Sequence, residues 1–310
     1  MNTAATNKTL IVIAGPTAVG KTDLALRVAR YYHADIISAD SRQCYREMNI
    51  GTAKPPRAAL ESVKHYFIDT HSVTETVSAG QFEQLALGYA GESFRQHDVT
   101  VLCGGTGLYI KALCEGLDAL PPVPASVRTH IRESFRQQGL DWLREEVRHK
   151  DPDFFKTTTE QQNPHRLMRA LEVYEATGTS ITRFRSGKQQ QRPFRIIRVG
   201  MEMPRDALRE RIYQRVDRMM EEGLAEEVKG LYPHRQLSAL QTVGYRELFD
   251  WLEHKCSLSE AVAAIKTNTC RYAKRQMTWF RKDPSIRWFD AREQAAITGY
   301  LASALPDTRT

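Results

Sequence analysis

A glycine-rich stretch near the N-terminus constrains the fold more than any other feature of this sequence. Residues 15–22, GPTAVGKT, fit the spacing G-x-x-x-x-G-K-T. They follow the apolar, β-branched run TLIVIA at residues 9–14 and lead into TDLALRVARYY, where Leu24, Val28 and Tyr31 recur at helical spacing. A strand, a glycine-rich loop and a helix in this order predict a phosphate-binding loop at the edge of a parallel sheet.

The residue types in this loop suit a polyphosphate. Gly15 and Gly20 allow the backbone to wrap around an anion with its amides pointing inward, and the start of the following helix adds partial positive charge. Lys21 is expected to reach the terminal phosphates, and the hydroxyl of Thr22 is expected to hold Mg²⁺. The loop therefore predicts binding of a di- or triphosphate. On its own it is typical of ATP-binding proteins, with a nucleotide kinase or an ATPase as the default.

Two further candidate strands end in chemically rich loops. The run ADIISAD ends at Asp40, and VTVLC ends at Cys103 and turns through the glycine-rich residues 104–107 into another helix. A later strand is expected at residues 195–203, RIIRVGMEM. Strands that alternate with helices predict an α/β protein with a P-loop NTPase-like, doubly wound parallel sheet, whose ligands bind at the carboxyl ends of the strands. The loops after the first three strands should therefore meet at one edge.

A proline-rich break interrupts this pattern. After ALPPVPAS at residues 119–126 the chain becomes highly charged and helical in pattern. We predict an inserted helical domain at residues 116–195, with residues 1–115 and 196–310 forming the catalytic core. Apolar residues then recur at helical spacing over residues 208–231, which predicts one long amphipathic helix.

Composition adds a preference for polyanionic partners. The formal net charge is +7 and the sequence pI is about 9.1, and each Lys or Arg that neutralises a phosphate releases a counterion. Five cysteines without C-x-x-C pairing are typical of reduced cytosolic thiols. No apolar run approaches the roughly 18 residues of a membrane helix, and the polar N-terminus lacks a signal-peptide core. We expect a soluble cytoplasmic protein with no membrane contact, and nothing in the sequence requires more than a monomer.

The last long helix carries a basic face. No acidic residue occurs between residues 261 and 282, which is unusual for a face that is merely solvated. Tyr272, Trp279 and Phe280 lie on other sides of this helix, and we expect them in the core. The side chains that share the basic face are Arg271, Lys274, Arg275, Thr278 and Lys282.

Six segments, in order along the chain, resemble the signatures of the tRNA dimethylallyltransferases, also called tRNA isopentenyltransferases. The resemblance spans nearly the whole chain, and the six segments in register are far more specific than any one of them. The absence of a C-terminal zinc finger implies the bacterial type. The segments are GPTAVGKT (15–22), SADSRQCYREMNIGTAKP (38–55), GGTGLYIKALCEGL (104–117), HRLMRALEVYEATG (165–178), QTVGYREL (241–248) and YAKRQMTWFRK (272–282).

The resemblance implies an unusual use of the phosphate loop. In this family the loop holds the diphosphate of dimethylallyl diphosphate, which is the leaving group. The exocyclic N6 amine of the adenosine 3′-adjacent to the anticodon attacks the allylic carbon, which gives N6-isopentenyladenosine and diphosphate. The implied partners are a tRNA anticodon stem-loop and dimethylallyl diphosphate, and the implied cofactor is Mg²⁺, held by Thr22. The residues implied for the diphosphate are Gly15, Pro16, Thr17, Ala18, Val19, Gly20, Lys21 and Thr22.

Four residues are implied for catalysis: Asp40, Thr17, Lys21 and Arg215. Asp40 would be the general base, because an adenine amine is a poor nucleophile that must lose a proton as the new bond forms. From the residues alone, a helix-capping role for Asp40 is an equal alternative. Lys21 and Arg215 would neutralise the departing charge, with Arg211 one turn away as the alternative to Arg215.

An enzyme that modifies a base inside a loop must take that base out of its stack. Ser41 to Gln43 follow the proposed base and would contact the extruded adenine or its flank. From the residues alone, the helix with Arg166 and Arg169 is better explained as an ordinary amphipathic helix, with Leu167 and Leu171 packed inward and the arginines solvated. The residues implied for tRNA binding are Asp40, Ser41, Arg42, Gln43, Thr106, Arg128, His165, Arg166, Leu167, Met168, Arg169, Gln241, Thr242, Val243, Gly244, Tyr245, Arg246, Lys274, Arg275, Gln276 and Arg281.

Some positions depart from the family pattern, and two other functions compete with it. Arg42 replaces a more usual apolar residue, and Cys270 stands where an arginine is common, which would weaken one phosphate contact. A P-loop kinase for a metabolite or nucleotide is the main rival. The second is a non-catalytic RNA-binding protein with a vestigial nucleotide site, against which the intact Lys21, Thr22 and Asp40 argue.

Overall fold

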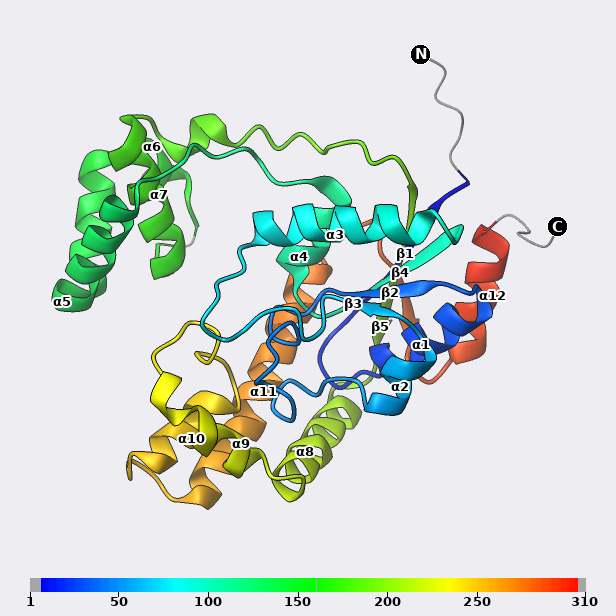
Figure 1. Cartoon of the computed structure of the whole chain (residues 1–310). Helices are drawn as coiled ribbons and strands as arrows, with labels where there is room; N and C mark the ends of the chain where they lie inside the picture. The colour runs from blue at the N-terminus through cyan, green and yellow to red at the C-terminus, as the bar shows by residue number, and fades with distance from the viewer. Residues whose placement is uncertain (1–6, 160, 306–310) are drawn as a thin grey trace, which may run out of the picture. The chain divides into compact units, whose positions relative to one another are not determined.

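The computed structural model describes residues 7–159 and 161–305, which form two compact units (Figure 1). One unit runs to Glu115 and resumes at Gln191, and the other spans Gly116–Gln190. The first unit contains the phosphate loop and all the strands described below.

The chain rejoins the first unit at Gln191, slightly before the predicted boundary at residue 196, and the contacts of Arg192 explain this difference. Its Nε donates to the carbonyl of Leu113 at 2.8 Å, and one terminal nitrogen donates to the carbonyl of Ala112 at 2.7 Å. The same guanidinium pairs with Glu83 at 2.6 Å, and its side chain is only 6% exposed. A buried, fully paired arginine thus fixes the chain to the first unit before the next strand begins.

Six strands in the described residues form one sheet in the order β3-β2-β4-β1-β5-β6. Every neighbouring pair is parallel, which confirms the predicted α/β fold with a parallel sheet. The central strand is buried at every position, as expected for a strand covered on both faces. The strands are β1 (Thr9–Ala14), β2 (Asp35–Ser38), β3 (His65–Tyr66), β4 (Val99–Cys103), β5 (Arg195–Glu202) and β6 (Arg287–Asp290).

Helices cover both faces of this sheet. Alternate residues of β1 point to opposite faces, so Ile11 and Ile13 join the core under α1 (Lys21–Tyr31) and α12 (Gln294–Ala304). Leu10 and Val12 join the core on the other face, which α3, α4 and α11 cover. These three helices span Ala79–Phe94, Gly107–Glu115 and Leu258–Phe280.

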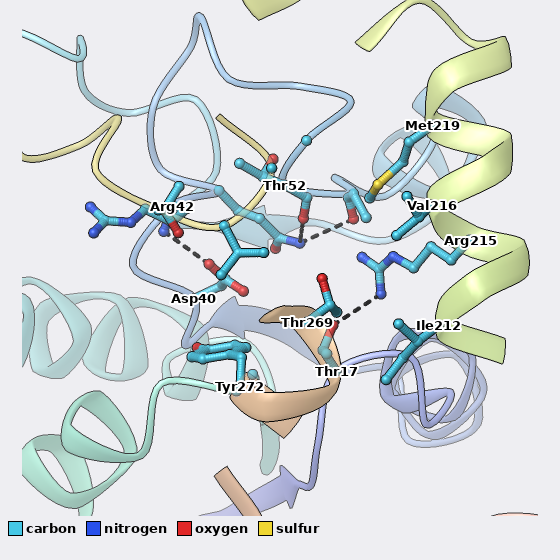
Figure 2. A pocket seen from close by; sticks show the side chains of 18 of the residues that line it. Thr17, Asp40, Arg42, Thr52, Ile212, Arg215, Val216, Met219, Thr269 and Tyr272 are labelled. Atoms are coloured by element: carbon cyan, nitrogen blue, oxygen red, sulfur yellow. Dashed lines mark hydrogen bonds between the residues drawn. The ribbon is translucent and has the colours of Figure 1, made fainter. Parts of the chain in front are cut away.

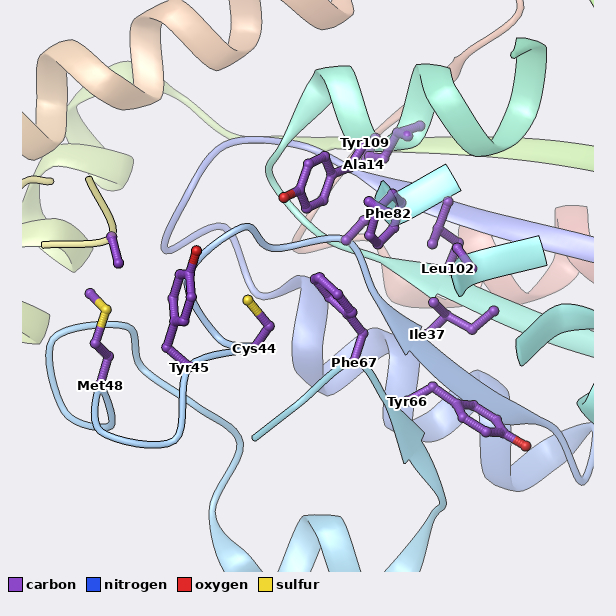
Figure 3. Packing of buried hydrophobic residues seen from close by; sticks show 14 of the residues in the cluster. Ala14, Ile37, Cys44, Tyr45, Met48, Tyr66, Phe67, Phe82, Leu102 and Tyr109 are labelled. Carbon is purple, nitrogen blue, oxygen red and sulfur yellow. The ribbon is translucent and has the colours of Figure 1, made fainter. Parts of the chain in front are cut away.

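Aromatic rings dominate the core on that second face (Figure 3). Phe82 of α3 stacks on Tyr109 of α4 with ring centroids 4.1 Å apart, and Phe67 packs edge-on against Phe82 at 5.0 Å. All three side chains are at least 95% buried, as are the flanking Ile37 and Leu102 of the sheet. This packing fixes α4, and with it the glycine-rich turn that precedes α4, against the end of β4.

The prediction of one long amphipathic helix over residues 208–231 is wrong, because this segment contains two helices. α8 spans Arg205–Glu221 and α9 spans Leu224–Leu231. Gly223 lies between them with φ of 98°, a left-handed conformation that favours glycine and commonly ends a helix. The apolar spacing continues across the break because both helices pack into the same core, so spacing alone concealed the turn.

Smaller elements complete the first unit. α2 spans Arg57–Ser62, and α10 spans Tyr245–Leu252. A short 3₁₀-helix, η2, lies at Tyr232–His234. In the part of the chain that the structure describes, no helix has both the length and the apolar character needed to cross a membrane.

The second unit is helical and has its own hydrophobic core. Leu143 and Val147 of the longest helix pack with Phe154 and Leu171. That helix kinks at Gly139, whose φ is 79°. The elements of this unit are α5 (Ala125–Lys150), α6 (Pro152–Thr157), α7 (Pro164–Thr177) and the 3₁₀-helix η1 (Ile181–Phe184).

Candidate active site

A cavity of about 290 Å³ lies at the carboxyl ends of β1, β2 and β4 (Figure 2). The phosphate loop, the loop at residues 40–53 and the glycine-rich turn at 103–105 form part of its wall. Helices α8, α9 and α11 and the segment at residues 242–244 supply the remainder. The three loops that sequence analysis expected at one edge of the sheet therefore border the same cavity.

The phosphate loop holds its lysine inward. α1 begins at Lys21, and Gly20 before it has φ of 102°. The Nζ of Lys21 donates to the carbonyl of Pro16 at 2.7 Å, which folds the side chain back into the loop. The pKa of Lys21 is lowered from 10.5 to about 8, mainly by burial and also by the nearby Arg215, whose effects outweigh the opposing ones of Cys103 and Asp40. Because Lys21 is withdrawn from water and lies near the guanidinium of Arg215, an anion would bind favourably at this position.

Arg215 reaches the same loop from α8. Its NH1 donates to Oγ1 of Thr17 at 3.3 Å, and burial lowers the pKa of the guanidinium (Figure 2). Arg211, one turn earlier, does not line this cavity, and its terminal nitrogens lie 3.8 Å from where a Cβ of Gly20 would stand. The geometry therefore favours Arg215 over Arg211 as the cation inside the cavity.

Asp40 lies two residues beyond the end of β2 and lines the cavity opposite the phosphate loop. Its Oδ1 accepts the backbone N–H of Arg42 at 2.9 Å. Residues 41–44 form turns rather than a helix, so the carboxylate stabilises a turn and does not cap a helix. That bond fixes the orientation of the carboxylate while it borders the cavity shared with Lys21 and Arg215.

Gln43 and Thr106 shape the cavity wall through local bonds. The Nε2 of Gln43 donates to the carbonyls of Thr52 and Ala53, each at 3.2 Å, and its Oε1 accepts the hydroxyl of Ser38 at 3.0 Å. The Oγ1 of Thr106 accepts the N–H of Ser41 at 3.0 Å. Both side chains, which were expected to contact RNA, tie loops together at this edge of the sheet.

Gln276 lies inside the protein rather than on the basic face of α11. It is 6% exposed, its Oε1 accepts the N–H of Thr17 at 2.9 Å, and its Nε2 donates to the carbonyl of Gly105 at 2.9 Å. A Cβ on Gly105 would collide with that Nε2, so any other residue there would displace the amide of Gln276. Both ends of its amide join the phosphate loop to the glycine-rich turn, and the side chain lines the cavity, so its expected RNA contact stays a prediction.

An apolar lining was missed in the sequence as part of the site. Ile212, Val216 and Met219 point from α8 toward the cavity beside Arg215, and Ile265 joins them from α11 (Figure 2). Sequence spacing identified the α8 residues only as a buried stripe. Their closeness in sequence to Arg215, a candidate catalytic residue, was the signal that this apolar stripe also borders a ligand site.

Tyr272 also lines the cavity, although it was expected in the core. Burial raises the pKa of its phenol to about 12, with a further contribution from Asp40. The phenol is therefore neutral at physiological pH and offers a hydrogen-bond donor close to the candidate base.

Many candidate RNA-binding residues are exposed within their own units. Lys274 and Arg275 make no ion pair among the residues that the structure describes, whereas Arg281 pairs with Glu202. In the second unit, Arg128 and Arg169 share the carboxylate of the largely buried Glu172. The exposed candidates are Arg128, His165, Arg166, Gln241, Arg246, Lys274, Arg275 and Arg281.

Several of the remaining candidates, including Ser41, Arg42 and Gly244, lie at the cavity or in the interior. Thr242 and Val243 line the cavity. Tyr245 and Leu167 are fully buried, each in its own unit. The expected RNA contacts of these two side chains are corrected, because they pack in hydrophobic cores and present no surface to a ligand.

Glu227 of α9 holds the loop that closes the cavity, and no sequence motif pointed to it. Its carboxylate accepts the backbone N–H groups of Asn49, Ile50 and Gly51 at 2.9, 2.8 and 3.1 Å. It also accepts the hydroxyl of Tyr245 at 2.6 Å. A Cβ on Gly51 would lie 2.6 Å from the Tyr245 ring, so the loop fits closely against this tyrosine.

Replacing Glu227 with glutamine should lower the free energy of unfolding by about 1–3 kcal/mol, because an amide cannot accept all four hydrogen bonds. Denaturant unfolding of the purified protein measures the change. The matched control is Glu226→Gln on the same helix. Its carboxylate is exposed, and its ion pair with Lys229 is long, at 3.9 Å. This change should alter the free energy of unfolding by less than about 0.5 kcal/mol. Equal midpoints for Glu227→Gln and the wild type would contradict this role.

Comparison with known proteins identifies a consistent set of relatives. The IPP transferase family model matches residues 43–283. The chain is 45% identical over 297 residues to a tRNA dimethylallyltransferase of Christiangramia forsetii, covering 96% of this chain and 98% of the relative. A tRNA dimethylallyltransferase of Cytophaga hutchinsonii is 43% identical, with 97% and 99% covered.

Solved structures agree with these relatives. A tRNA isopentenylpyrophosphate transferase from Bacillus halodurans is 34% identical, with a TM-score of 0.71 and 96% of this chain and 97% of that chain covered. A eukaryotic dimethylallyltransferase, described as acting on tRNA, is 25% identical, with a TM-score of 0.80. The likeness covers 97% of this chain and 81% of that one.

Proposed function

Since this chain belongs to the tRNA dimethylallyltransferase family, we propose that its cavity holds dimethylallyl diphosphate against an adenosine of tRNA. The enzyme is a prenyltransferase that acts on tRNA. It transfers the dimethylallyl group to the exocyclic N6 amine of the adenosine 3′-adjacent to the anticodon, which gives N6-isopentenyladenosine and diphosphate. The observation that carries the proposed arrangement is the meeting of Asp40, Lys21 and Arg215 on one cavity.

The donor fits the two chemical halves of the cavity. Its diphosphate would lie in the phosphate loop, where Lys21, Arg215 and the loop amides donate to its oxygens. Its five-carbon group would lie against Val216 and Met219. Because both cations are withdrawn from water, they stabilise the charge of the departing diphosphate more strongly than they would at the surface.

Thr22 is the residue that would hold Mg²⁺. Within residues 7–159 and 161–305, no three His, Cys, Asp or Glu side chains gather into a metal cage. A hydroxyl on the first turn of α1, together with diphosphate oxygens and water, suits an ion that prefers oxygen ligands and retains part of its hydration. Bound there, Mg²⁺ would supply further neutralisation of the leaving group.

The acceptor amine would lie between Asp40 and the allylic carbon. As the bond between N6 and that carbon forms, the bond from the carbon to the diphosphate oxygen breaks. The amine proton passes to the Asp40 carboxylate, whose orientation the N–H of Arg42 fixes. The neutral phenol of Tyr272 is available to hold the purine.

Transfer of label to RNA tests this function directly. The protein is incubated with Mg²⁺, radiolabelled dimethylallyl diphosphate and unmodified tRNA, and the label in the RNA is counted. We expect label in that tRNA and none in a transcript with guanosine at the target position, because guanosine lacks the N6 amine. A chelator should suppress the reaction. Absence of label, with ATP consumed in the presence of a small metabolite, would favour the kinase alternative instead.

A further inference from the structure

Trp279 stands at the surface, although sequence analysis placed it in the core. Its residue surface is 36% exposed, whereas that of the adjacent Phe280 is 2% exposed. A Cβ on Gly107 would collide with the five-membered ring of Trp279, so the indole lies directly on the backbone of the glycine-rich turn. The turn supports one side of the indole, and 36% of the residue's surface is open to solvent.

This indole continues a line of side chains that begins in the cavity. Tyr272 and Gln276 of α11 line the cavity. Trp279 follows them at i+7 and i+3, so the three share one side of the helix. Seven residues of helix rise about 10 Å, which places Trp279 roughly two turns from Tyr272 and just outside the residues that line the cavity.

The surroundings of Trp279 are cationic. Arg275 precedes it by one turn and Lys282 follows it by three residues, and both are exposed. Neither makes an ion pair in the part of the chain that the structure covers. Leu108, which follows Gly107, is 44% exposed and extends the apolar surface. An exposed aromatic ring beside cations that make no ion pair is the chemistry that binds unstacked RNA.

We propose that Trp279 is a stacking surface for a nucleobase adjacent to the adenosine that enters the cavity. This inference rests on the proposed function, which makes RNA the occupant. Extrusion of one base breaks its stacking with its neighbours, and an indole beside the cavity replaces part of that stacking for the neighbour left behind. Arg275 and Lys282 neutralise phosphates on either side of the stacked base.

Binding of an anticodon stem-loop RNA tests this role. Trp279→Ala should weaken the affinity for the RNA by roughly 5- to 150-fold, the range for loss of one base–aromatic stack. Trp279→Phe, which retains a ring, should stay within a few-fold of the wild type. The matched control is Leu258→Ala at the opposite end of the same helix from Trp279, where the leucine is 38% exposed and does not line the cavity; it should not change the affinity. Affinity for dimethylallyl diphosphate should be unchanged in all three variants.

RNAs with one abasic nucleotide separate stacking from a structural role. If Trp279 stacks on a particular base, removing that base should weaken binding to the wild type and add no further loss in Trp279→Ala. Wild-type affinity in Trp279→Ala would overturn the proposal, as would an equal loss on every abasic RNA, which would mean that the indole only supports the turn. Self-association that Trp279→Ala abolishes, at unchanged RNA affinity, would assign this face to a protein contact. If the wild type still transfers label to tRNA, failure of the stacking proposal leaves the proposed function intact. If the wild type transfers no label, the proposed function itself is refuted, and the stacking proposal that rests on it fails with it.

Discussion

Replacing Asp40 with asparagine should slow transfer of the dimethylallyl group by about 10²–10⁴-fold while both substrates still bind. Asparagine keeps an oxygen for the N–H of Arg42, so the turn after β2 should persist. It cannot take the amine proton, and that is the step in which the carboxylate is proposed to act. Single-turnover rates with saturating donor measure the chemical step, and equilibrium binding measures the two affinities.

The control for Asp40→Asn is Asp250→Asn, a surface change on α10 that removes a carboxylate 3.0 Å from Lys255. It should leave the rate of transfer unchanged. If Asp40→Asn instead lost affinity for tRNA or donor in proportion to its loss of rate, Asp40 would be a binding residue, and the assignment as base would fail. An unchanged rate would point to a different base.

Replacing Lys21 with methionine should weaken binding of dimethylallyl diphosphate by about 2–5 kcal/mol, roughly 30- to 4,000-fold, because a buried charge would lose its partner. Methionine keeps most of the side-chain volume, so the loop is expected to fold. Isothermal titration with the donor measures the effect. Lys229→Met, at an exposed lysine of α9, is the control and should bind the donor normally. Normal donor affinity in Lys21→Met would exclude this lysine from the diphosphate site.

The lowered pKa of Lys21 also predicts how donor binding depends on pH. In the free enzyme this amine loses its charge as pH rises through about 8, which is below the usual value of 10.5 because burial disfavours the ammonium form. The diphosphate binds the charged form, so the contribution of Lys21 to affinity should be fully present well below pH 8 and be lost as pH rises above it. Lys21→Met should not show this fall, which separates the titration of the lysine from that of the donor.

Local patterns were enough to predict the framework of the fold. The β-branched apolar runs of β1, β4 and β5 lie where they were expected, because a strand covered on both faces requires such runs. The phosphate loop was equally clear, since its glycines, lysine and threonine are adjacent in the chain. Asp40 was placed at the correct sheet edge because parallel strands all end on the same side.

Contacts between distant segments could not be predicted in the same way. The bond between Gln276 and Thr17 spans 259 residues, and the bond between Glu227 and Asn49 spans 178. Neither partner has a local feature that indicates the other. Trp279 was assigned to the core because large aromatic residues are usually buried. Its partial exposure depends on how α11 packs on Gly107, and this contact between distant segments has no local signal in the sequence.

The bond from Gln276 to the phosphate loop also sets when the enzyme becomes competent during its synthesis. Thr17 leaves the ribosome early, and its partner follows 259 residues later, which at about 5–20 residues per second takes roughly 13–52 s. The central strand β1 must likewise wait for β5, its neighbour in the sheet, which begins at residue 195. A nascent chain that ends before α11 therefore lacks one wall of its own catalytic cavity, so newly made protein gains activity only after α11 has been synthesised.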